Sequence, residues 1–115
     1  MKISIANDFS RAPWGRFPSD GDYCGENFRK ALLLPALRSE DKVTVDLDGV
    51  AGLGSSFLDE AFGGLVRYDG FTPEALSSKM EILTNEEDFR MYVVLIWQYI
   101  KEAGISIPRR RLASA

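Results

Sequence analysis

Apolar and polar side chains alternate in three short segments of the chain, which is the pattern of β-strands with one buried face. The three segments are residues 2–6, 42–47 and 79–83. In the second segment Val43, Val45 and Leu47 share one face, and its β-branched residues favour a strand further. The sequence therefore predicts three strands.

Apolar residues at spacings of three and four predict amphipathic helices between and after these strands. The predicted helices cover residues 26–34, a segment that starts at Ser55 or Ser56 and ends at residues 68–70, a turn at residues 73–77, and residues 84–103. We expect Pro35 to end or kink the first of them. Thr84 and Glu87 have the spacing of a capping box, and Gly104 is expected to end the last helix.

The order of these elements predicts an α/β fold. A strand, a long loop over residues 7–25 and then alternating helices and strands are typical of a short, mostly parallel sheet with helices packed on it. A chain of 115 residues is long enough for one such domain. We expect a single domain over residues 1–108 and a flexible basic tail over residues 109–115.

The composition excludes several classes of site. The chain has no histidine, so it cannot form a Ser-His or Cys-His nucleophile pair or a histidine-ligated metal site by itself. Its single cysteine, Cys24, excludes an internal disulfide and a multi-cysteine metal cluster. We expect a protein that is not an enzyme and that has no catalytic residues, no cofactor and no metal.

The charge of the chain is unevenly distributed. The formal net charge is −3, from 14 basic and 17 acidic residues, and three of the basic residues are the consecutive arginines 109–111. The remaining chain is acidic, which disfavours general nucleic-acid binding. No segment is apolar enough for a membrane span or a signal peptide, and a single thiol fits a reducing compartment, so we expect a cytoplasmic protein.

The junction between the second strand and the following helix carries the most informative residues. Gly54, Ser55 and Ser56 follow the acidic end of the strand. A serine at a helix start is exposed, and the backbone N–H groups and helix dipole there stabilise an anion such as a phosphate. The alternative is that Ser56 simply caps the helix.

Residues 43–66 resemble the STAS domain of anti-sigma factor antagonists, a bacterial regulatory class with a D-S-S-G or D-S-T-G motif at this junction. The chain is more similar to the STAS-like family of unknown function. The matching elements are Gly15-Arg16, Gly21-Asp22, Phe28-Arg29, Val43 to Asp46, and Ser55 to Glu60. The resemblance covers roughly residues 2–83 and implies a small STAS-like domain.

This resemblance implies a non-enzymatic regulatory module that binds a partner protein, as a monomer or weak dimer. In the antagonists, a GHKL-type kinase phosphorylates the junction serine and the partner is released. Ser55, with Ser56 beside it, is the matching phosphoacceptor, although Gly54 stands where the family has aspartate. The expected partner-binding residues are Phe57, Asp59, Glu60 and Asp48. With a phosphate, Asp59 and Glu60 would repel an acidic partner.

The glycine-rich loop over residues 13–25 offers a different function. Glycines allow backbone N–H groups to converge on an anion, and an arginine can supply a bidentate donor. The residues of such a small-molecule or nucleotide sensor are Gly15, Arg16, Asp20, Gly21 and Asp22. Neither a P-loop nor a dinucleotide fingerprint is present. Two other interpretations are a loop whose aromatic residues pack on the sheet and a protein-binding loop.

Overall fold

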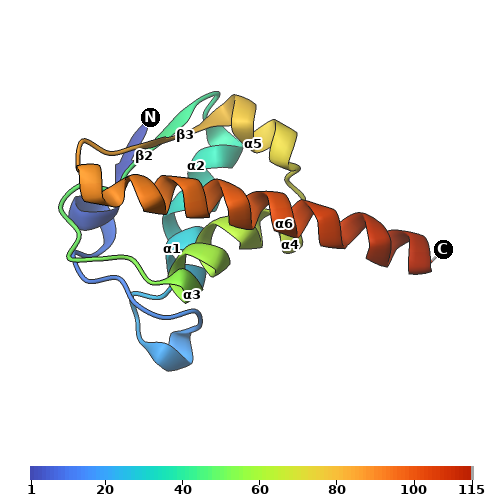
Figure 1. Cartoon of the computed structure of the whole chain (residues 1–115), viewed down its shortest axis with the longest axis horizontal. Coiled ribbons are helices and arrows are strands. Elements are labelled where there is room, and N and C mark those ends of the chain that lie inside the picture. Colours follow the sequence, from blue (N-terminus) through green and yellow to red (C-terminus); the bar gives the residue numbers. More distant parts are fainter. Residues whose placement is uncertain (115) are drawn as a thin grey trace.

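The computed structural model describes the backbone of residues 1–114 and the side chains of residues 1–105. It contains a parallel three-stranded sheet in the order β1-β2-β3 (Figure 1). The strands are β1 (Lys2–Ser4), β2 (Val43–Asp46) and β3 (Met80–Leu83). Ile3 pairs with Val45, and Val45 with Ile82. The prediction of a small α/β fold with a short parallel sheet is confirmed.

Helices cover one face of the sheet. Ile3, Val45 and Met80 point into the core and are buried, whereas Lys2 and Glu81 on the other face are exposed. This one-sided burial explains why apolar and polar residues alternate in the sequence. The open face is polar.

The predicted strand at residues 2–6 is shorter than expected. β1 ends at Ser4, and a single wide helical turn of the π type, η1 (Ile5–Phe9), follows it. The Ser4 hydroxyl accepts the N–H of Asn7 at 3.1 Å and caps this turn. A polar side chain that can bond to the backbone therefore ends the strand where hydrophobic alternation alone would extend it.

The first long helix runs without interruption over residues 25–39. Its parts are α1 (Gly25–Phe28), the π turn η3 (Arg29–Leu33) and α2 (Leu34–Ser39). Pro35 does not end this helix, so the first of the two effects expected of it is wrong. In the π turn the Leu34 N–H bonds to the Arg29 carbonyl five residues back, and this wider turn lies directly before the residue that cannot donate.

The second long helix runs over residues 55–67 and follows β2. Its parts are α3 (Ser55–Leu58), the π turn η4 (Asp59–Gly63) and α4 (Gly64–Arg67). Gly54 is its N-cap residue, and no side chain caps this end. The interpretation of Ser56 as the cap is therefore wrong. Gly70, with φ of 84°, lies in the predicted turn after the helix.

A short helix and the longest helix complete the fold. α5 (Pro73–Lys79) begins as predicted with proline in its first turn, and the Thr72 hydroxyl accepts the Ala75 N–H at 3.1 Å. It extends slightly beyond the predicted turn. A 3-10 turn, η5 (Glu87–Phe89), precedes α6 (Arg90–Ser114).

Both predicted ends of the longest helix are wrong. Thr84 does not form a capping box: its hydroxyl accepts the N–H of Glu86, two residues on, at 3.0 Å and donates to Asp48 at 2.6 Å, and the helix starts only after η5. Gly104 does not end the helix. A Cβ at Gly104 would lie 2.6 Å from Cγ of Pro73, so glycine here permits α6 to approach the start of α5.

Helix 55–67 lies at the centre of the helical layer. It contacts helix 25–39 on one side and α6 on the other, and α6 crosses the front of the molecule in Figure 1. Phe28 lies between Phe57 and Phe62, with ring centroids 5.8 and 6.3 Å away. Ile96 and Ile100 complete the core from α6, on the face that the sequence predicted.

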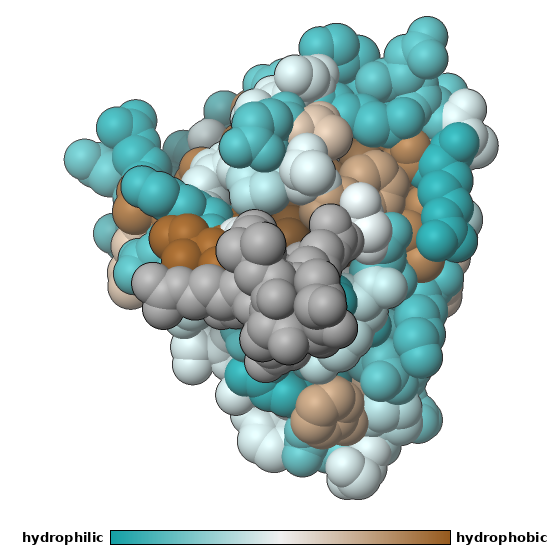
Figure 2. All heavy atoms as spheres, turned by 90° about the vertical axis from the view of Figure 1, so that its right-hand side faces the viewer, coloured by the Kyte–Doolittle hydropathy of each residue, from teal (hydrophilic) through white to brown (hydrophobic). Residues whose placement is uncertain are grey.

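The end of the molecule toward which α6 points is mainly hydrophilic, and apolar surface there forms separate patches (Figure 2). Across the described part of the chain, no helix has the length and apolar character of a membrane span. The side chains of the predicted basic tail, residues 109–115, lie outside the described residues, and the division at residue 108 stays a prediction.

Candidate functional site

Ser55 and Ser56 occupy the first turn of helix 55–67 and are exposed. They line a hollow of about 270 Å³, which we call the junction hollow. Its lining residues are Trp14, Gly15, Asp20, Gly54, Ser55, Ser56 and Phe57. Within residues 1–105 neither serine hydroxyl makes a hydrogen bond, so both are available to a ligand or an enzyme.

The other wall of the junction hollow comes from the loop over residues 13–25. The base of the loop is closed by two backbone bonds, from Trp14 N–H to the Tyr23 carbonyl and from Gly25 N–H to the Gly15 carbonyl, each 2.9 Å long. Gly15 has φ of 87°, and a Cβ there would lie 2.5 Å from Cβ of Asp20, so the turn requires glycine. The loop projects from the lower side of the molecule in Figure 1.

Asp20 is held in place inside this loop. Its Oδ2 accepts the backbone N–H groups of Arg16 at 2.9 Å and Phe17 at 3.1 Å. The hydrogen bonds from Phe17 and then Arg16 lower the pKa of Asp20, so the carboxylate is charged at neutral pH. The junction hollow thus has a fixed negative charge on its wall.

The aromatic residues of the loop face solvent. Trp14 is 65% exposed, Phe17 42% and Tyr23 53%, although Tyr23 also touches Phe9 edge-on at 5.5 Å. The interpretation that these rings attach the loop to the sheet is therefore wrong. Exposed aromatic side chains next to a hollow are typical of protein-binding surfaces.

Arg16 faces helix 55–67 rather than an open anion site. Its Nη1 donates to Asp59 Oδ2 at 2.8 Å and to Glu60 Oε1 at 3.4 Å. The hydrogen bond with Asp59 raises the pKa of Arg16. Gly21 and Asp22, the remaining residues of the predicted anion loop, are exposed, and the Asp22 carbonyl accepts the Asn27 amide at 2.8 Å.

Arg16 belongs to a network that we call the arginine–carboxylate cluster. Its members are Arg16, Arg29, Arg67, Asp59, Glu60 and Asp69. Glu60 is 1% exposed and lies 2.7 Å from Arg29 Nη1, and Arg29 Nε lies 3.0 Å from Asp69. Three arginines balance three carboxylates. Buried charges persist only when they are paired in this way.

The π turn of helix 55–67 helps to build the cluster. The N–H of Gly64 bonds to the Asp59 carbonyl instead of the Glu60 carbonyl that a regular α-helix would use. The Glu60 carbonyl accepts Nη1 of Arg29, and Arg67 Nη2 donates to the Asp59 carbonyl at 3.0 Å. The arginines therefore satisfy backbone as well as side-chain oxygens in the wide turn.

Two of the predicted partner-binding residues are not at the surface. Phe57 borders the junction hollow, but its side chain is fully buried among the other phenylalanines, and Glu60 is buried in the cluster, so neither side chain is exposed to a partner in this conformation. Asp59 is partly exposed but is paired with Arg16 and Arg67. Burial opposes its ionisation, yet the hydrogen bonds from both arginines outweigh burial and lower the pKa of Asp59. The predicted acidic surface is neutralised.

Asp48 lies apart from the junction hollow and holds the ends of two strands together. It accepts the Thr84 hydroxyl at 2.6 Å and the Asn85 N–H at 3.1 Å. The hydrogen bond from Thr84 lowers the pKa of Asp48. Among the described residues, no acidic or cysteine side chains form a group of three that could hold a metal ion.

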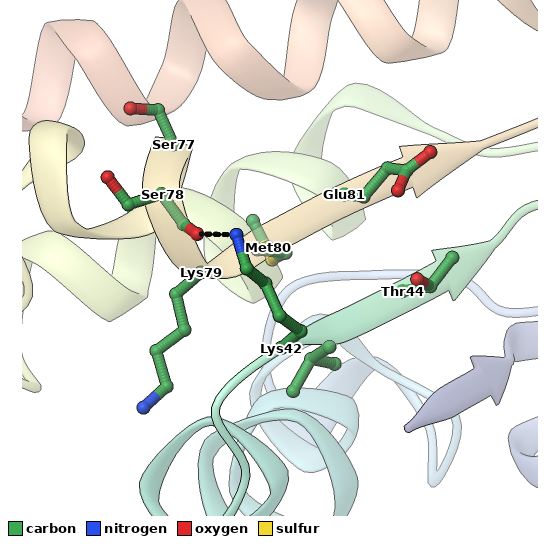
Figure 3. Close-up of a pocket in the computed structure, with 8 residues that line it drawn as sticks. Lys42, Thr44, Ser77, Ser78, Lys79, Met80 and Glu81 are labelled. Carbon is green, nitrogen blue, oxygen red and sulfur yellow. Dashed lines mark hydrogen bonds between the residues drawn. The ribbon is translucent and has the colours of Figure 1, made fainter.

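A second hollow, of about 260 Å³, lies at the opposite end of the strands (Figure 3). Lys42 reaches across it and donates to the Ser78 carbonyl at 2.7 Å. The hydroxyls of Ser77 and Ser78 donate to the Glu74 carbonyl within α5. These polar groups are therefore already hydrogen-bonded within the protein. The bond from Lys42 connects the start of β2 to α5.

The comparisons with known proteins identify the family. A family model described as a STAS-like domain of unknown function (DUF4325) matches residues 24–89. The chain belongs to this family. The match includes Ser55, Arg29, Glu60 and the strands β2 and β3, whereas Trp14 and Arg16 lie before it. Searches of curated proteins and of solved structures found no match.

Sequence reasoning found Ser55, Ser56 and Arg16 but missed the cluster around Glu60. Phe28-Arg29 and Glu60 were part of the family resemblance, and the structure shows why they occur together. A further signal was Gly63-Gly64: a Cβ at Gly64 would collide with the Arg29 guanidinium. A glycine pair inside a helix permits close approach of a neighbouring element, and here the neighbour is Arg29.

Proposed function

We propose that this STAS-like protein is a non-enzymatic regulatory module that binds a partner protein at the junction hollow. The observation that carries the proposal is the pair of exposed, unbonded hydroxyls of Ser55 and Ser56 beside the exposed Trp14 ring. A large ring with few rotatable bonds, next to polar groups that lack partners, has the chemistry of a protein-binding surface.

Ion pairs hold the helix and the loop that form the walls of the junction hollow, and this rigidity favours binding. Helix 55–67 is held from one side by Arg16 and Arg29 and from its own end by Arg67. The same Arg16 ties the loop that carries Trp14 to this helix. Both walls of the junction hollow are therefore fixed before a partner arrives, which reduces the entropy lost on binding.

We propose Ser55 as the phosphoacceptor of a GHKL-type kinase, as the family resemblance suggests. Ser55 is the first residue of the helix, where backbone N–H groups stabilise a phosphate. Gly54 lacks the carboxylate of the antagonist motif, but Asp20 brings a carboxylate to the same hollow. We propose that Asp20 takes over the orientation of the serine hydroxyl.

The phosphorylation proposal is tested by incubating the protein with ATP and a GHKL-type kinase encoded near it. Intact mass and peptide mapping should show one phosphate on Ser55. The Ser55→Ala variant should lose it, and Ser56→Ala, the matched control, should keep it. No phosphate on the wild type, or equal loss in both variants, would contradict the switch.

The docking proposal is tested with that kinase or another partner by calorimetry. We expect Trp14→Ala to weaken binding about tenfold or more, since a central aromatic residue often contributes over 1 kcal/mol to an interface. Met91→Ala is the control, because Met91 is similarly exposed but lies on α6. Equal effects of the two substitutions would place the interface elsewhere.

The alternative function, a small-molecule or nucleotide sensor in the loop over residues 13–25, has less support. Nη1 of Arg16 is bonded to Asp59 and Glu60, and no basic residue of the described range 1–105 lines the junction hollow. An anion would find little attraction there. We propose a cytoplasmic location, with which the buried free thiol of Cys24 agrees.

A further inference from the structure

The junction hollow has the electrostatic character of a cation site. Among the residues whose side chains are described, Asp20 is the only charged one that lines it. Asp59 and Glu60, which follow the two serines on helix 55–67, are neutralised by arginines of the chain itself. Asp20 thus lines the junction hollow without an ion pair to any described residue, and its charge is open to a partner.

The chemical groups around the junction hollow match a guanidinium. Trp14 offers a flat indole face, on which an arginine side chain can stack by cation–π attraction. Asp20 uses Oδ2 for the two loop N–H groups, and within the described residues Oδ1 has no partner. The hydroxyls of Ser55 and Ser56 add further acceptors.

No arginine of the described chain fills the junction hollow. Arg16, the arginine nearest in sequence to Trp14 and Asp20, forms an ion pair with Asp59 at 2.8 Å instead. Arg67 bonds to Asp59 from within helix 55–67, at 2.9 Å, and Arg29 is buried. The site for a guanidinium is therefore open.

We infer that the junction hollow binds an arginine side chain of the partner protein, between the Trp14 ring and the Asp20 carboxylate. The inference rests on the proposed docking function and names the chemistry of the partner. Planar stacking and a fork of donors favour arginine over lysine at such a site.

This inference reverses the expected effect of phosphorylation on the affinity for the partner. A phosphate on Ser55 adds about −1.5 to −2 charges next to Asp20. An arginine binds a phosphate through two parallel hydrogen bonds, which are stronger than bonds to a neutral hydroxyl. Phosphorylation of Ser55 therefore tightens the complex, whereas the antagonist resemblance implies release.

The test uses the unmodified protein and blocked tripeptides Gly-Xaa-Gly in an NMR titration. The probes have arginine, lysine or the neutral isostere citrulline at the central position. We expect the arginine peptide to shift the Trp14 indole and the amides of Ser55 and Ser56, with Trp97 unchanged as an internal control. Lysine should bind more weakly, and citrulline should give no saturable shift.

Variants test the two walls separately. Asp20→Asn keeps the acceptor for the loop N–H groups but removes the charge, and should weaken the arginine peptide about threefold. Trp14→Ala should weaken it by about threefold. Asp22→Asn, outside the junction hollow, should have no effect. Ser55→Asp should bind about twofold more tightly than the neutral Ser55→Asn.

Several outcomes would overturn the inference. Equal shifts with arginine and citrulline would show that charge is irrelevant, and equal affinity for lysine and arginine would remove the stacking argument. Chemical-shift changes confined to residues outside the junction hollow would show that arginine binds elsewhere. Weaker binding by Ser55→Asp than by Ser55→Asn would contradict the prediction that a negative charge at this position tightens the complex. None of these results depends on a kinase, so a failed phosphorylation experiment leaves this test intact.

Discussion

The first and second turns of helix 55–67 contrast sharply although they adjoin. Ser55 and Ser56 in the first turn are exposed and have no hydrogen bonds within the described residues. Glu60, one turn later, is buried with three arginines around it. The same helix thus has surface hydroxyls without hydrogen bonds and, a few residues later, a buried carboxylate that is paired with arginines.

This contrast separates the ion pairs that stabilise the domain from the junction hollow, where we propose that a partner binds. The second turn holds the helix, the loop over residues 13–25 and helix 25–39 together through ion pairs. The first turn contributes no such contact and is free to meet a partner. Substitutions of the charged residues in the second turn should therefore affect the free energy of unfolding, and those of Ser55 and Ser56 in the first turn should affect the proposed binding alone.

The largest effect is expected for Glu60→Gln. This change leaves the buried Arg29 with Asp69 as its remaining counter-charge, and breaking a buried ion pair typically costs about 3 kcal/mol. Urea unfolding followed by circular dichroism measures it. Glu26→Gln is the matched control, because its pair with Lys30 is solvent-exposed and 3.8 Å long. Similar losses in both variants would contradict the contrast.

A smaller loss, of about 2 kcal/mol, is expected for Gly64→Ala. The new methyl group would displace the Arg29 guanidinium from the Glu60 carbonyl, and overpacking of this kind is destabilising. Gly54→Ala serves as the comparison, since a Cβ there meets nothing within 4 Å. The expectation fails if thermal unfolding ranks the two variants in the opposite order.

Asp59→Asn should change the acid sensitivity of the protein. Because the pKa of Asp59 is lowered on folding, its contribution is present above the ordinary aspartate pKa and lost as the pH falls through the lower folded value. We expect wild type to be more stable by about 0.5–1 kcal/mol at pH 7, with the gap closing as the pH falls below about 4. Urea unfolding across this range measures it, and a gap independent of pH would contradict the assignment.

The smallest effects on stability are expected in the first turn. Ser55→Ala and Ser56→Ala remove hydroxyls that bond to nothing in the described structure, so each should change the free energy of unfolding by less than about 0.5 kcal/mol. A loss above 1 kcal/mol in either variant would mean that the first turn also holds the fold.

The sequence predicted the parts of the fold that depend on local patterns. Alternation around Val43 and Val45 predicted β2, and the spacing of Ile96 and Ile100 predicted the buried face of α6. The junction serines could be recognised because they begin the helix that comes after β2. In each case the relevant signal lies within a few neighbouring residues.

Features that depend on distant residues could not be predicted in this way. Glu60 is charged, so its sequence position alone predicts an exposed side chain, and its burial requires arginines from three separate segments. Gly104 resembles a helix end, but its role is set by Pro73. A π turn directly before Pro35 allows the helix to continue. The apolar spacing of this segment carries no clear sign of that turn.

The π turn at Asp59–Gly63 also has a consequence for comparing relatives of this chain. Each residue advances an α-helix by about 100°, so the residue count through this turn sets the angle between the two ends of the helix. A relative one residue shorter here would present its serines on a different side from Trp14 and Asp20. The number of residues between the serine pair and Gly64 therefore distinguishes a relative that keeps the junction hollow from one that has the serines without this geometry.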